Sequence, residues 1–345
     1  MMQRGFAVPP PIGRGMKYTK RYFFLVVLTL AAAPLAALAQ VSYLASDHTP
    51  LSSPAAATGD FASPDQSVLT IKKRVNEVNL LFIATDKHGK FVRNLTENDF
   101  SILDDHKPPQ AIVTFGRETD LPLRLGLLID TSGSVRTRFA FEQEAAISFL
   151  QQTLRRDFDQ AFVMGFNTHS LITQDFTDDS ALLAAGVQRL RNGGGTALYD
   201  AIYHACQTKL AKEQGNHPLR RALIVVSDGE DNQSEVTAMQ AIEMAERAEV
   251  IIYAISTDDS GLILRGDNAL QQLADWTGGR AFFPYKTKDV KNSFAAIEDE
   301  LRSQYAVSYH PADFEADGRY RPIEITSLKK DTQIRARKGY YAPRQ

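Results

Sequence analysis

Two patterns of apolar and polar residues divide this chain into regions. Between residues 121 and 303, short continuous apolar runs are separated by longer segments whose apolar residues recur every three to four positions. Such runs are typical of strands buried on both faces, and the longer segments are typical of amphipathic helices. Their alternation predicts an α/β fold: a doubly wound, mostly parallel sheet with right-handed crossovers and helices on both faces. The expected strands are 124–130, 160–166, 170–176, 222–228, 250–256 and 280–285, and the expected helices are 141–155, 180–191, 197–211, 237–248, 269–277 and 290–303.

Local features refine this prediction. The second and third strands are so close in sequence that they predict an antiparallel hairpin at one edge of the sheet. Ser180 and Thr237 stand at the start of helical patterns and are expected to be helix caps. The only cysteine, Cys206, falls on the apolar stripe of a predicted helix, which indicates a packed thiol rather than a reactive one.

A period of two, typical of strands with one buried face, flanks that region on both sides. It covers residues 75–84, 100–103 and 112–115 before it, and 305–309, 320–325 and 334–341 after it, with a helical turn expected at 95–100. Each set alone would be marginal, so we expect one small β-sandwich-like domain built from both chain ends, with the α/β domain inserted. The alternative is two separate β-modules. Arg335 and Arg337 would share one strand face, which is typical of a solvated edge that resists aggregation.

The amino-terminal residues predict export. Residues 1–21 carry five basic residues and no acid, residues 22–38 are apolar, and Ala37-Leu38-Ala39 offers a cleavage site. The alternative is an uncleaved anchor that tethers the protein to a membrane, because the apolar run is near the lower limit for a spanning helix. Residues 40–67, rich in Ala, Ser, Pro and Thr, are expected to be a flexible linker. The predicted organisation is a signal peptide at 1–39, the linker at 40–67, β-strands at 68–118, the α/β domain at 119–303 and further β-strands at 304–345.

Removal of the signal changes the charge of the chain. The whole chain has a net charge of −2, whereas the mature chain keeps 34 Lys and Arg against 41 Asp and Glu, a net charge of −7. An exported acidic protein with scattered charges is a poor candidate for binding nucleic acid.

The candidate chemistry lies where the apolar strands end. The run Leu125–Ile129 stops abruptly at Asp130-Thr131-Ser132-Gly133-Ser134, and the carboxyl ends of strands are where ligands bind in open α/β sheets. Three oxygen-bearing side chains, Asp130, Ser132 and Ser134, can converge there. Hard oxygen donors without thiol or imidazole suit Mg²⁺, Mn²⁺ or Ca²⁺ and disfavour zinc.

Two further segments complete a known pattern. Gly193-Gly194-Gly195-Thr196 precedes a helical segment, and another apolar strand ends in Ser227-Asp228-Gly229. The Asp-x-Ser-x-Ser string with this Thr and this Asp resembles the metal-ion-dependent adhesion site of von Willebrand factor A domains. The order of strands and helices resembles the Rossmann-like fold of that family. The export signal and the flanking strands resemble a family of exported proteins abundant in acidobacterial genomes.

The resemblance implies a metal site made of Asp130, Ser132, Ser134, Thr196 and Asp228. It implies that the hydroxyls bind Mg²⁺ directly, that the two acids act partly through water, and that a carboxylate of a protein partner fills an open position. Two carboxylates about 5 Å apart repel by roughly 3 kcal/mol at an effective dielectric constant near 20, and a divalent cation reverses that sign. Gly195, Asp200 and Glu230 are placed at the rim where a partner would bind. The alternative reading of the same acids and hydroxyls is helix capping and turn stabilisation.

Three functions remain open at this point. The leading hypothesis is an exported, non-enzymatic binding module that captures a protein partner through the cation, without a small-molecule cofactor. The second is a scaffold whose metal is purely structural. The third is a metal-dependent hydrolase, which is disfavoured because the sequence has no Gly-x-Ser-x-Gly, His-Glu-x-x-His or Gly-x-x-x-x-Gly-Lys motif.

Overall fold

A computed structural model describes residues 77–117, 121–135, 138–211, 219–258, 260–286 and 289–344. The predicted signal peptide, the linker and the first residues of the β-domain, 68–76, lie outside the described residues. Within the described ranges, no helix combines the length and apolar character needed to cross a membrane.

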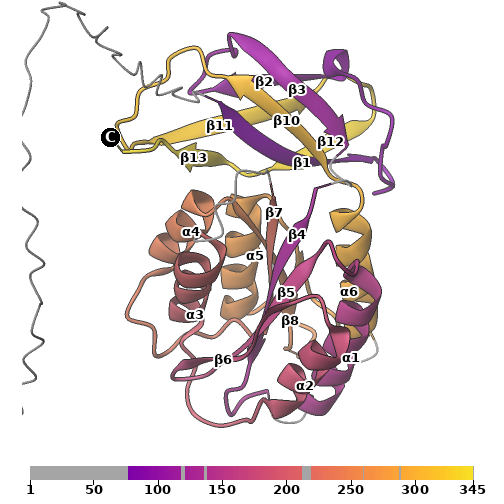
Figure 1. The fold of residues 1–345 in the computed structure, drawn as a ribbon, viewed down its shortest axis with the longest axis vertical. Coiled ribbons are helices and arrows are strands. Elements are labelled where there is room, and N and C mark those ends of the chain that lie inside the picture. Colours follow the sequence, from indigo (N-terminus) through magenta and orange to yellow (C-terminus); the bar gives the residue numbers. More distant parts are fainter. Residues whose placement is uncertain are drawn as a thin grey trace, which may run out of the picture. The chain divides into compact units, whose positions relative to one another are not determined.

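A six-stranded sheet in the order β6-β5-β4-β7-β8-β9 forms the centre of the α/β region (Figure 1). All neighbouring strands pair in parallel except β6, which is antiparallel to β5. The predicted parallel sheet and its edge hairpin are therefore confirmed. The strands are β4 (Leu123–Asp130), β5 (Gln160–Phe166), β6 (Ser170–Thr177), β7 (Arg220–Ser227), β8 (Val250–Ser256) and β9 (Ala281–Phe282).

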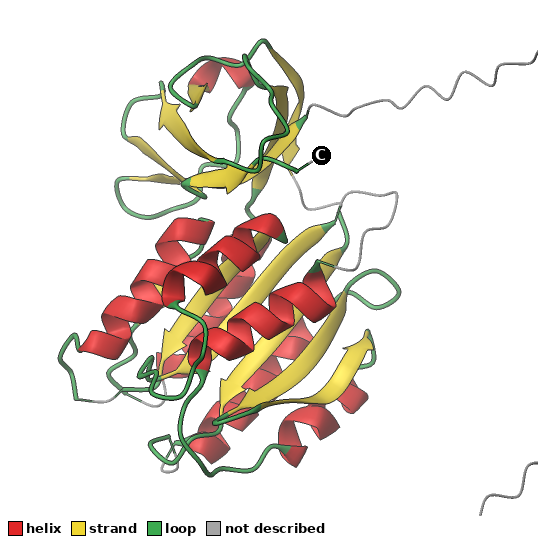
Figure 2. Cartoon of the chain, turned by 90° about the vertical axis from the view of Figure 1, so that its left-hand side faces the viewer, coloured by secondary structure: helices red, strands yellow, loops and turns green. Residues whose placement is uncertain are grey.

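Helices cover both faces of this sheet (Figures 1 and 2). One core contains Phe149, Leu183 and Phe294, which come from α1, α2 and α6, and the other contains residues of α3, α4 and α5, such as Ile202 and Leu270. Every residue of β8 is buried, as expected of a central strand that is covered on both faces. The helices are α1 (Phe139–Thr153), α2 (Ser180–Arg189), α3 (Leu198–Ala205), α4 (Ala238–Arg247), α5 (Arg265–Thr277) and α6 (Asp289–Leu301).

The helix ends agree with the sequence in one case and differ in another. Thr237 caps α4, and its hydroxyl accepts a hydrogen bond from the Gln240 amide. The prediction for Ser180 is wrong, because Asp179 caps α2 by accepting from the amides of Ala181 and Leu182. A carboxylate one residue earlier reaches the free amides of the first turn as well as a serine does. Helix α3 continues as a π-helix, Cys206–Leu210, and the Cys206 thiol is buried as predicted.

Strands from both chain ends build the remaining sheets, which have the orders β12-β1-β10-β3 and β13-β11-β2. Strand β1 pairs with both β10 and β12, so the alternative of two separate β-modules is wrong. Phe82, Phe100, Phe115 and Tyr305 pack at ring-centroid distances of 5.0 to 6.3 Å in a core shared by these sheets. The predicted sandwich-like domain is confirmed. Its strands are β1 (Val78–Asp86), β2 (Phe100–Asp104), β3 (Ala111–Arg117), β10 (Tyr305–His310), β11 (Tyr320–Ser327), β12 (Thr332–Ala336) and β13 (Gly339–Tyr341), and a 3₁₀-helix covers Glu97–Asp99.

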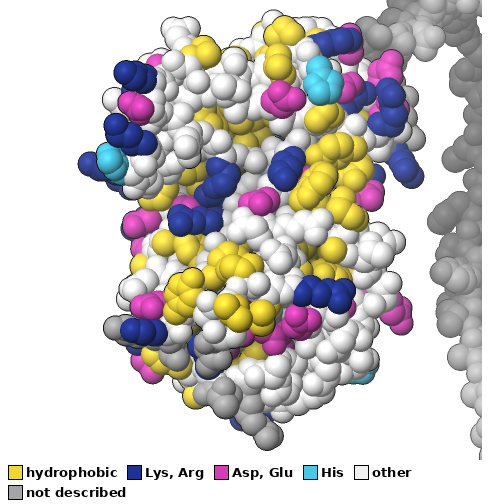
Figure 3. Space-filling model, turned by 180° about the vertical axis from the view of Figure 1, so that it is seen from behind, with side chains coloured by type: hydrophobic (Ala, Val, Ile, Leu, Met, Phe, Trp, Pro, Cys, Tyr) yellow, Lys and Arg dark blue, Asp and Glu magenta, His cyan; other side chains and the backbone are white. Residues whose placement is uncertain are grey.

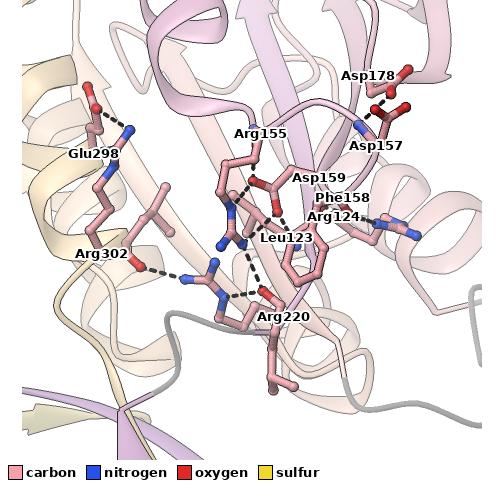
Figure 4. A network of polar contacts seen from close by, with 12 residues as sticks. Leu123, Arg124, Arg155, Asp157, Phe158, Asp159, Asp178, Arg220, Glu298 and Arg302 are labelled. Atoms are coloured by element: carbon pink, nitrogen blue, oxygen red, sulfur yellow. Dashed lines mark hydrogen bonds and ion pairs between the residues drawn. The ribbon is translucent and has the colours of Figure 1, made fainter.

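A polar network at the amino edge of the central sheet holds the starts of β4 and β7 (Figure 4). The Arg155 guanidinium donates to Asp159, whose other oxygen accepts from the Leu123 amide at 2.8 Å. Arg220 donates to the carbonyl of Leu301 at 2.5 Å and, like Arg155, to that of Leu121. Burial alone would raise the pKa of Asp159, but these hydrogen bonds hold it below its ordinary value. The network thus fixes the two strands whose far ends carry Asp130 and Asp228.

The predicted strand 334–341 is broken, and Arg335 is not on a solvated edge. Strand β12 ends at Ala336, and the guanidinium of Arg335 donates to the Gly278 carbonyl at 2.6 Å and to the buried Glu300 carboxylate at 2.5 Å. Arg337 lies between two strands and donates to the Asn79 carbonyl. Sequence periodicity missed this arrangement because the buried acid that requires a cation lies on α6, a different element.

Arg335→Ala is expected to lower the free energy of unfolding by about 2 kcal/mol, because Glu300 would keep only Arg280, at 3.5 Å, as an ion-pair partner. The value is less than that of a fully buried pair, since 30% of the Arg335 side chain is exposed. Urea denaturation measures the change. Lys107→Ala, which removes the exposed pair of Lys107 with Asp313, is the control and should change stability by less than about 0.5 kcal/mol. Equal effects of the two variants would contradict the prediction.

Candidate metal site

Three loops meet at the carboxyl edge of the central sheet. Asp130 is the last residue of β4, Asp228 follows β7, and Thr196 lies just before α3. Strands β4 and β7 are parallel neighbours, so their ends come together. The glycine-rich loop joins them, because the Gly193 amide donates to the Thr131 carbonyl at 2.7 Å and the Gly133 amide donates to the Gly194 carbonyl at 3.3 Å.

The Asp130 loop is held from within. One carboxylate oxygen of Asp130 accepts from the Ser132 amide at 2.8 Å, and the other accepts from the Ser227 hydroxyl at 2.6 Å. The hydroxyl oxygens of Ser132 and Ser134 are 2.9 Å apart. Asp130, Ser132 and Thr196 are buried. The structure thus brings Asp130, Ser132 and Ser134 together. The loop that carries Thr196 is hydrogen-bonded to the loop that carries these three residues.

Burial dominates the electrostatics of Asp130. Burial raises the pKa of Asp130 to about 6, although the hydrogen bonds from Ser227 and Ser132 lower it. The negative charge of Asp228 raises this pKa further. The charge of Asp228 has the sign expected from the strand-end positions of the two acids, but burial has the larger effect on Asp130. A divalent cation between them would remove this penalty.

Three residues that position the site were not predicted from the sequence. Ser227 connects the two acidic loops, since its hydroxyl donates to Asp130 and accepts from the Gly229 amide at 3.0 Å. Asn232 accepts a hydrogen bond from the Thr196 amide, and Thr168 accepts one from the Gly195 amide, both at 3.0 Å. Ser227 directly precedes Asp228, and this adjacency was the available signal. The other two gave none, because their roles depend on contacts between distant loops.

Glu142 on α1 is the most unusual residue near the site. It is 1% exposed, and neither of its carboxylate oxygens has a hydrogen-bond partner within the described part of the chain. Burial raises the pKa of Glu142 to about 8; Arg138 lowers it, whereas Asp130 and Asp228 raise it. The sequence gave no reason to single it out, since one acid in an amphipathic helix is ordinary.

The three predicted rim residues have different environments. A Cβ on Gly195 would lie 2.8 Å from the Asn232 side-chain oxygen, so glycine permits the close approach of the two loops. The Asp200 carboxylate accepts from the Glu235 and Val236 amides at 3.0 and 2.9 Å, and it therefore anchors the loop after Asp228. Glu230 is exposed, with its amide donating to Asp228 at 3.0 Å.

The donor set fits a hard divalent cation. All five predicted ligands offer oxygen, and the buried hydroxyls add donors without adding charge. Across the described ranges, no cluster of three or more His, Cys, Asp or Glu side chains is arranged to hold a metal. A cation here would therefore depend on the serine and threonine hydroxyls together with the two acids.

The fold and the site define a Rossmann-like α/β domain with an oxygen-rich site at the carboxyl edge of its sheet. The family model for the von Willebrand factor type A domain matches residues 125–299, about half of the chain, and the chain belongs to this family. No curated protein matches the sequence.

Several solved structures resemble the chain at low identity. Proximal thread matrix protein 1 from the mussel byssus, solved with zinc in its MIDAS motif, is 14% identical over 56% of this chain and 48% of its own, with a TM-score of 0.46. A von Willebrand factor type A protein from Catenulispora acidiphila is 14% identical over 72% and 74%, with a TM-score of 0.46. BatB from Bacteroides thetaiotaomicron is 17% identical over 52% and 97%, with a TM-score of 0.42. The chain spans about half the length of the mussel protein.

Proposed function

We propose that this chain is an exported binding protein whose von Willebrand factor A domain holds a divalent cation and, through it, a carboxylate of a protein partner. Asp130, Ser132, Ser134, Thr196 and Asp228 would hold the cation. Mg²⁺ is the leading choice, with Mn²⁺ and Ca²⁺ as alternatives, because all the donors are hard oxygens.

One observation carries the proposal: the buried Asp130 carboxylate is held beside the Ser132 and Ser134 hydroxyls at the end of β4, where burial, and to a smaller extent the charge of Asp228, opposes its ionisation. Fixed hydrogen bonds hold Asp130 in place, so a cation beside it would relieve the penalty of burying its charge without a rearrangement of the loop. A bound dication supplies a Lewis-acidic centre for a carboxylate from outside. The oxygens of the five side chains would hold that centre.

The surface supports a protein partner rather than nucleic acid. On the face shown in Figure 3, Lys and Arg side chains are interspersed with Asp and Glu. Nucleic-acid binding favours a continuous basic patch, and the mature chain has an excess of acids. The proposal includes no catalytic role and no small-molecule cofactor.

Mg²⁺ is expected to stabilise the mature chain by about 2.7 kcal/mol at a concentration 100 times its dissociation constant. Asp130→Ala and Thr196→Val should abolish this gain, because each removes one of the oxygens around the cation. Chemical denaturation with Mg²⁺ and with chelator measures it. Thr173→Val is a matched control, since the Thr173 hydroxyl is buried without a hydrogen-bond partner in the described structure and lies on β6.

An equal Mg²⁺ gain in the wild type and the Thr196 variant would refute the metal site. Mg²⁺ could also stabilise the wild type while partners bind equally well with and without it. That result would favour the alternative hypothesis, a scaffold whose metal is purely structural, over the binding module.

A further inference from the structure

Four large apolar side chains are exposed together beside the candidate metal site. Leu262, Ile263 and Leu264, in the loop between β8 and α5, are 67%, 58% and 41% exposed, and Tyr285 is 65% exposed. A Cβ on Gly261 would lie 3.5 Å from the Tyr285 ring, so the loops that carry these residues touch each other. We call these four residues the apolar ridge.

The ridge differs from the other exposed apolar residues of the described chain. Those six, Val113, Phe158, Leu171, Leu182, Met239 and Leu328, are separate in sequence, whereas three of the ridge residues are consecutive. Isolated exposed apolar side chains are normal, but a run of three in water is unfavourable unless another surface covers it.

Backbone contacts connect the loop of the ridge to the Asp228 loop. The Thr257 amide, at the start of the ridge loop, donates to the Ser227 carbonyl at 3.0 Å. At the other end of the loop, Gly266 packs on Asp228, because a Cβ on Gly266 would lie 2.1 Å from the Asp228 carbonyl oxygen. Leu264 precedes Gly266 by two residues. The loop that carries three of the ridge residues is therefore anchored at both ends to the segment that carries Asp228.

The ridge is also held in place before anything binds. The Leu264 amide donates to Asp267 at 3.0 Å, and Asp267 accepts from the Ser256 hydroxyl at 2.6 Å. The Ser260 hydroxyl accepts from the Leu262 amide at 3.2 Å. Surfaces ordered in advance lose less conformational entropy on binding.

We infer that the ridge and the metal site together bind one protein segment, in which an Asp or Glu is accompanied by large apolar side chains. This inference rests on the proposed function and adds the chemistry of the partner. The carboxylate binds the cation while the apolar side chains cover the ridge. We place the apolar side chains within about three positions of the acid, a reach of about 10 Å, since an extended chain advances about 3.3 Å per residue.

An array of nine-residue peptides tests this inference on the whole chain without its predicted signal peptide. Each peptide has a central Asp, Glu or Asn, flanked within three positions by Leu and Phe or by Ser, and binding is measured in Mg²⁺ and in chelator. We expect peptides with both an acid and apolar neighbours to bind at least tenfold more tightly than Ser-flanked acidic peptides, and only in Mg²⁺. The double variant Leu262→Ser, Ile263→Ser should lose this tenfold preference but keep the weaker Mg²⁺-dependent binding of acidic peptides. Leu171→Ser is the control, because Leu171 is equally exposed on β6.

The outcomes separate the two proposals. Mg²⁺-dependent binding of acidic peptides without an apolar preference, or with a preference that the double variant retains, would overturn the ridge and leave the metal site standing. Loss of Mg²⁺-dependent binding for every acidic peptide would overturn both. Apolar peptides that bind equally in chelator, or a self-association of the chain that the double variant abolishes, would assign the ridge to a different occupant and refute this inference.

Discussion

Glu142→Gln is expected to raise the free energy of unfolding of the metal-free protein at pH 8 and to flatten its dependence on pH. Burial raises the pKa of Glu142 to about 8 from its ordinary value of 4.5, so between these values the folded state binds a proton that the unfolded state has lost. Stability therefore falls as pH rises through this window, with a slope of up to about 1.4 kcal/mol per pH unit. Glutamine has nearly the same shape, stays neutral and removes this slope.

Urea denaturation in chelator at a series of pH values from 5 to 9 measures the effect. Glu144→Gln, on the exposed side of the same helix, is the control and should leave the slope unchanged. Glu246→Gln should also flatten the profile, because burial raises the pKa of Glu246 to about 8 as well. If Glu142→Gln lowers stability at pH 8, the carboxylate has a favourable partner and the interpretation is wrong.

The sequence predicted the central sheet well because its signal is local. A strand buried on both faces must be a continuous apolar run, and each of these runs, from Leu125–Ile129 onward, is flanked by turn residues. Asp130, Ser132 and Ser134 are adjacent along the chain, so their meeting at the end of β4 was also predicted from local sequence, whereas Thr196 and Asp228 were added by the resemblance to von Willebrand factor A domains. The packing of the rest of the fold changes only where the strands begin and end. Strand β9, for example, is shorter than the expected strand 280–285.

What the sequence did not reveal depends on contacts between distant elements. Arg335 alternates like a surface strand residue, but α6 places the buried Glu300 beside it. Glu142 occupies an ordinary helical position, and only the packing of α1 near the ends of β4 and β7 makes its burial costly.

Gly266→Ala is expected to weaken Mg²⁺ binding at least tenfold, about 1.4 kcal/mol, although residue 266 supplies no ligand. Its Cβ would lie 2.1 Å from the Asp228 carbonyl oxygen and 3.0 Å from the Glu230 amide nitrogen. These are backbone atoms, so no side-chain rotation relieves the clash, and the Asp228 loop and the start of α5 must separate; we expect this shift to displace Asp228. Overpacking of this kind also costs about 1–3 kcal/mol of stability.

Calorimetric titration of the folded variant with Mg²⁺ measures the affinity, and urea denaturation in chelator measures the stability separately. Gly116→Ala is the matched control, because a Cβ on Gly116 meets nothing within 4 Å; it should change stability by less than about 1 kcal/mol and leave Mg²⁺ affinity unchanged. An unaltered affinity in Gly266→Ala, with the stability loss still present, would contradict the prediction, because it would show that the clash is absorbed without disturbing the cation.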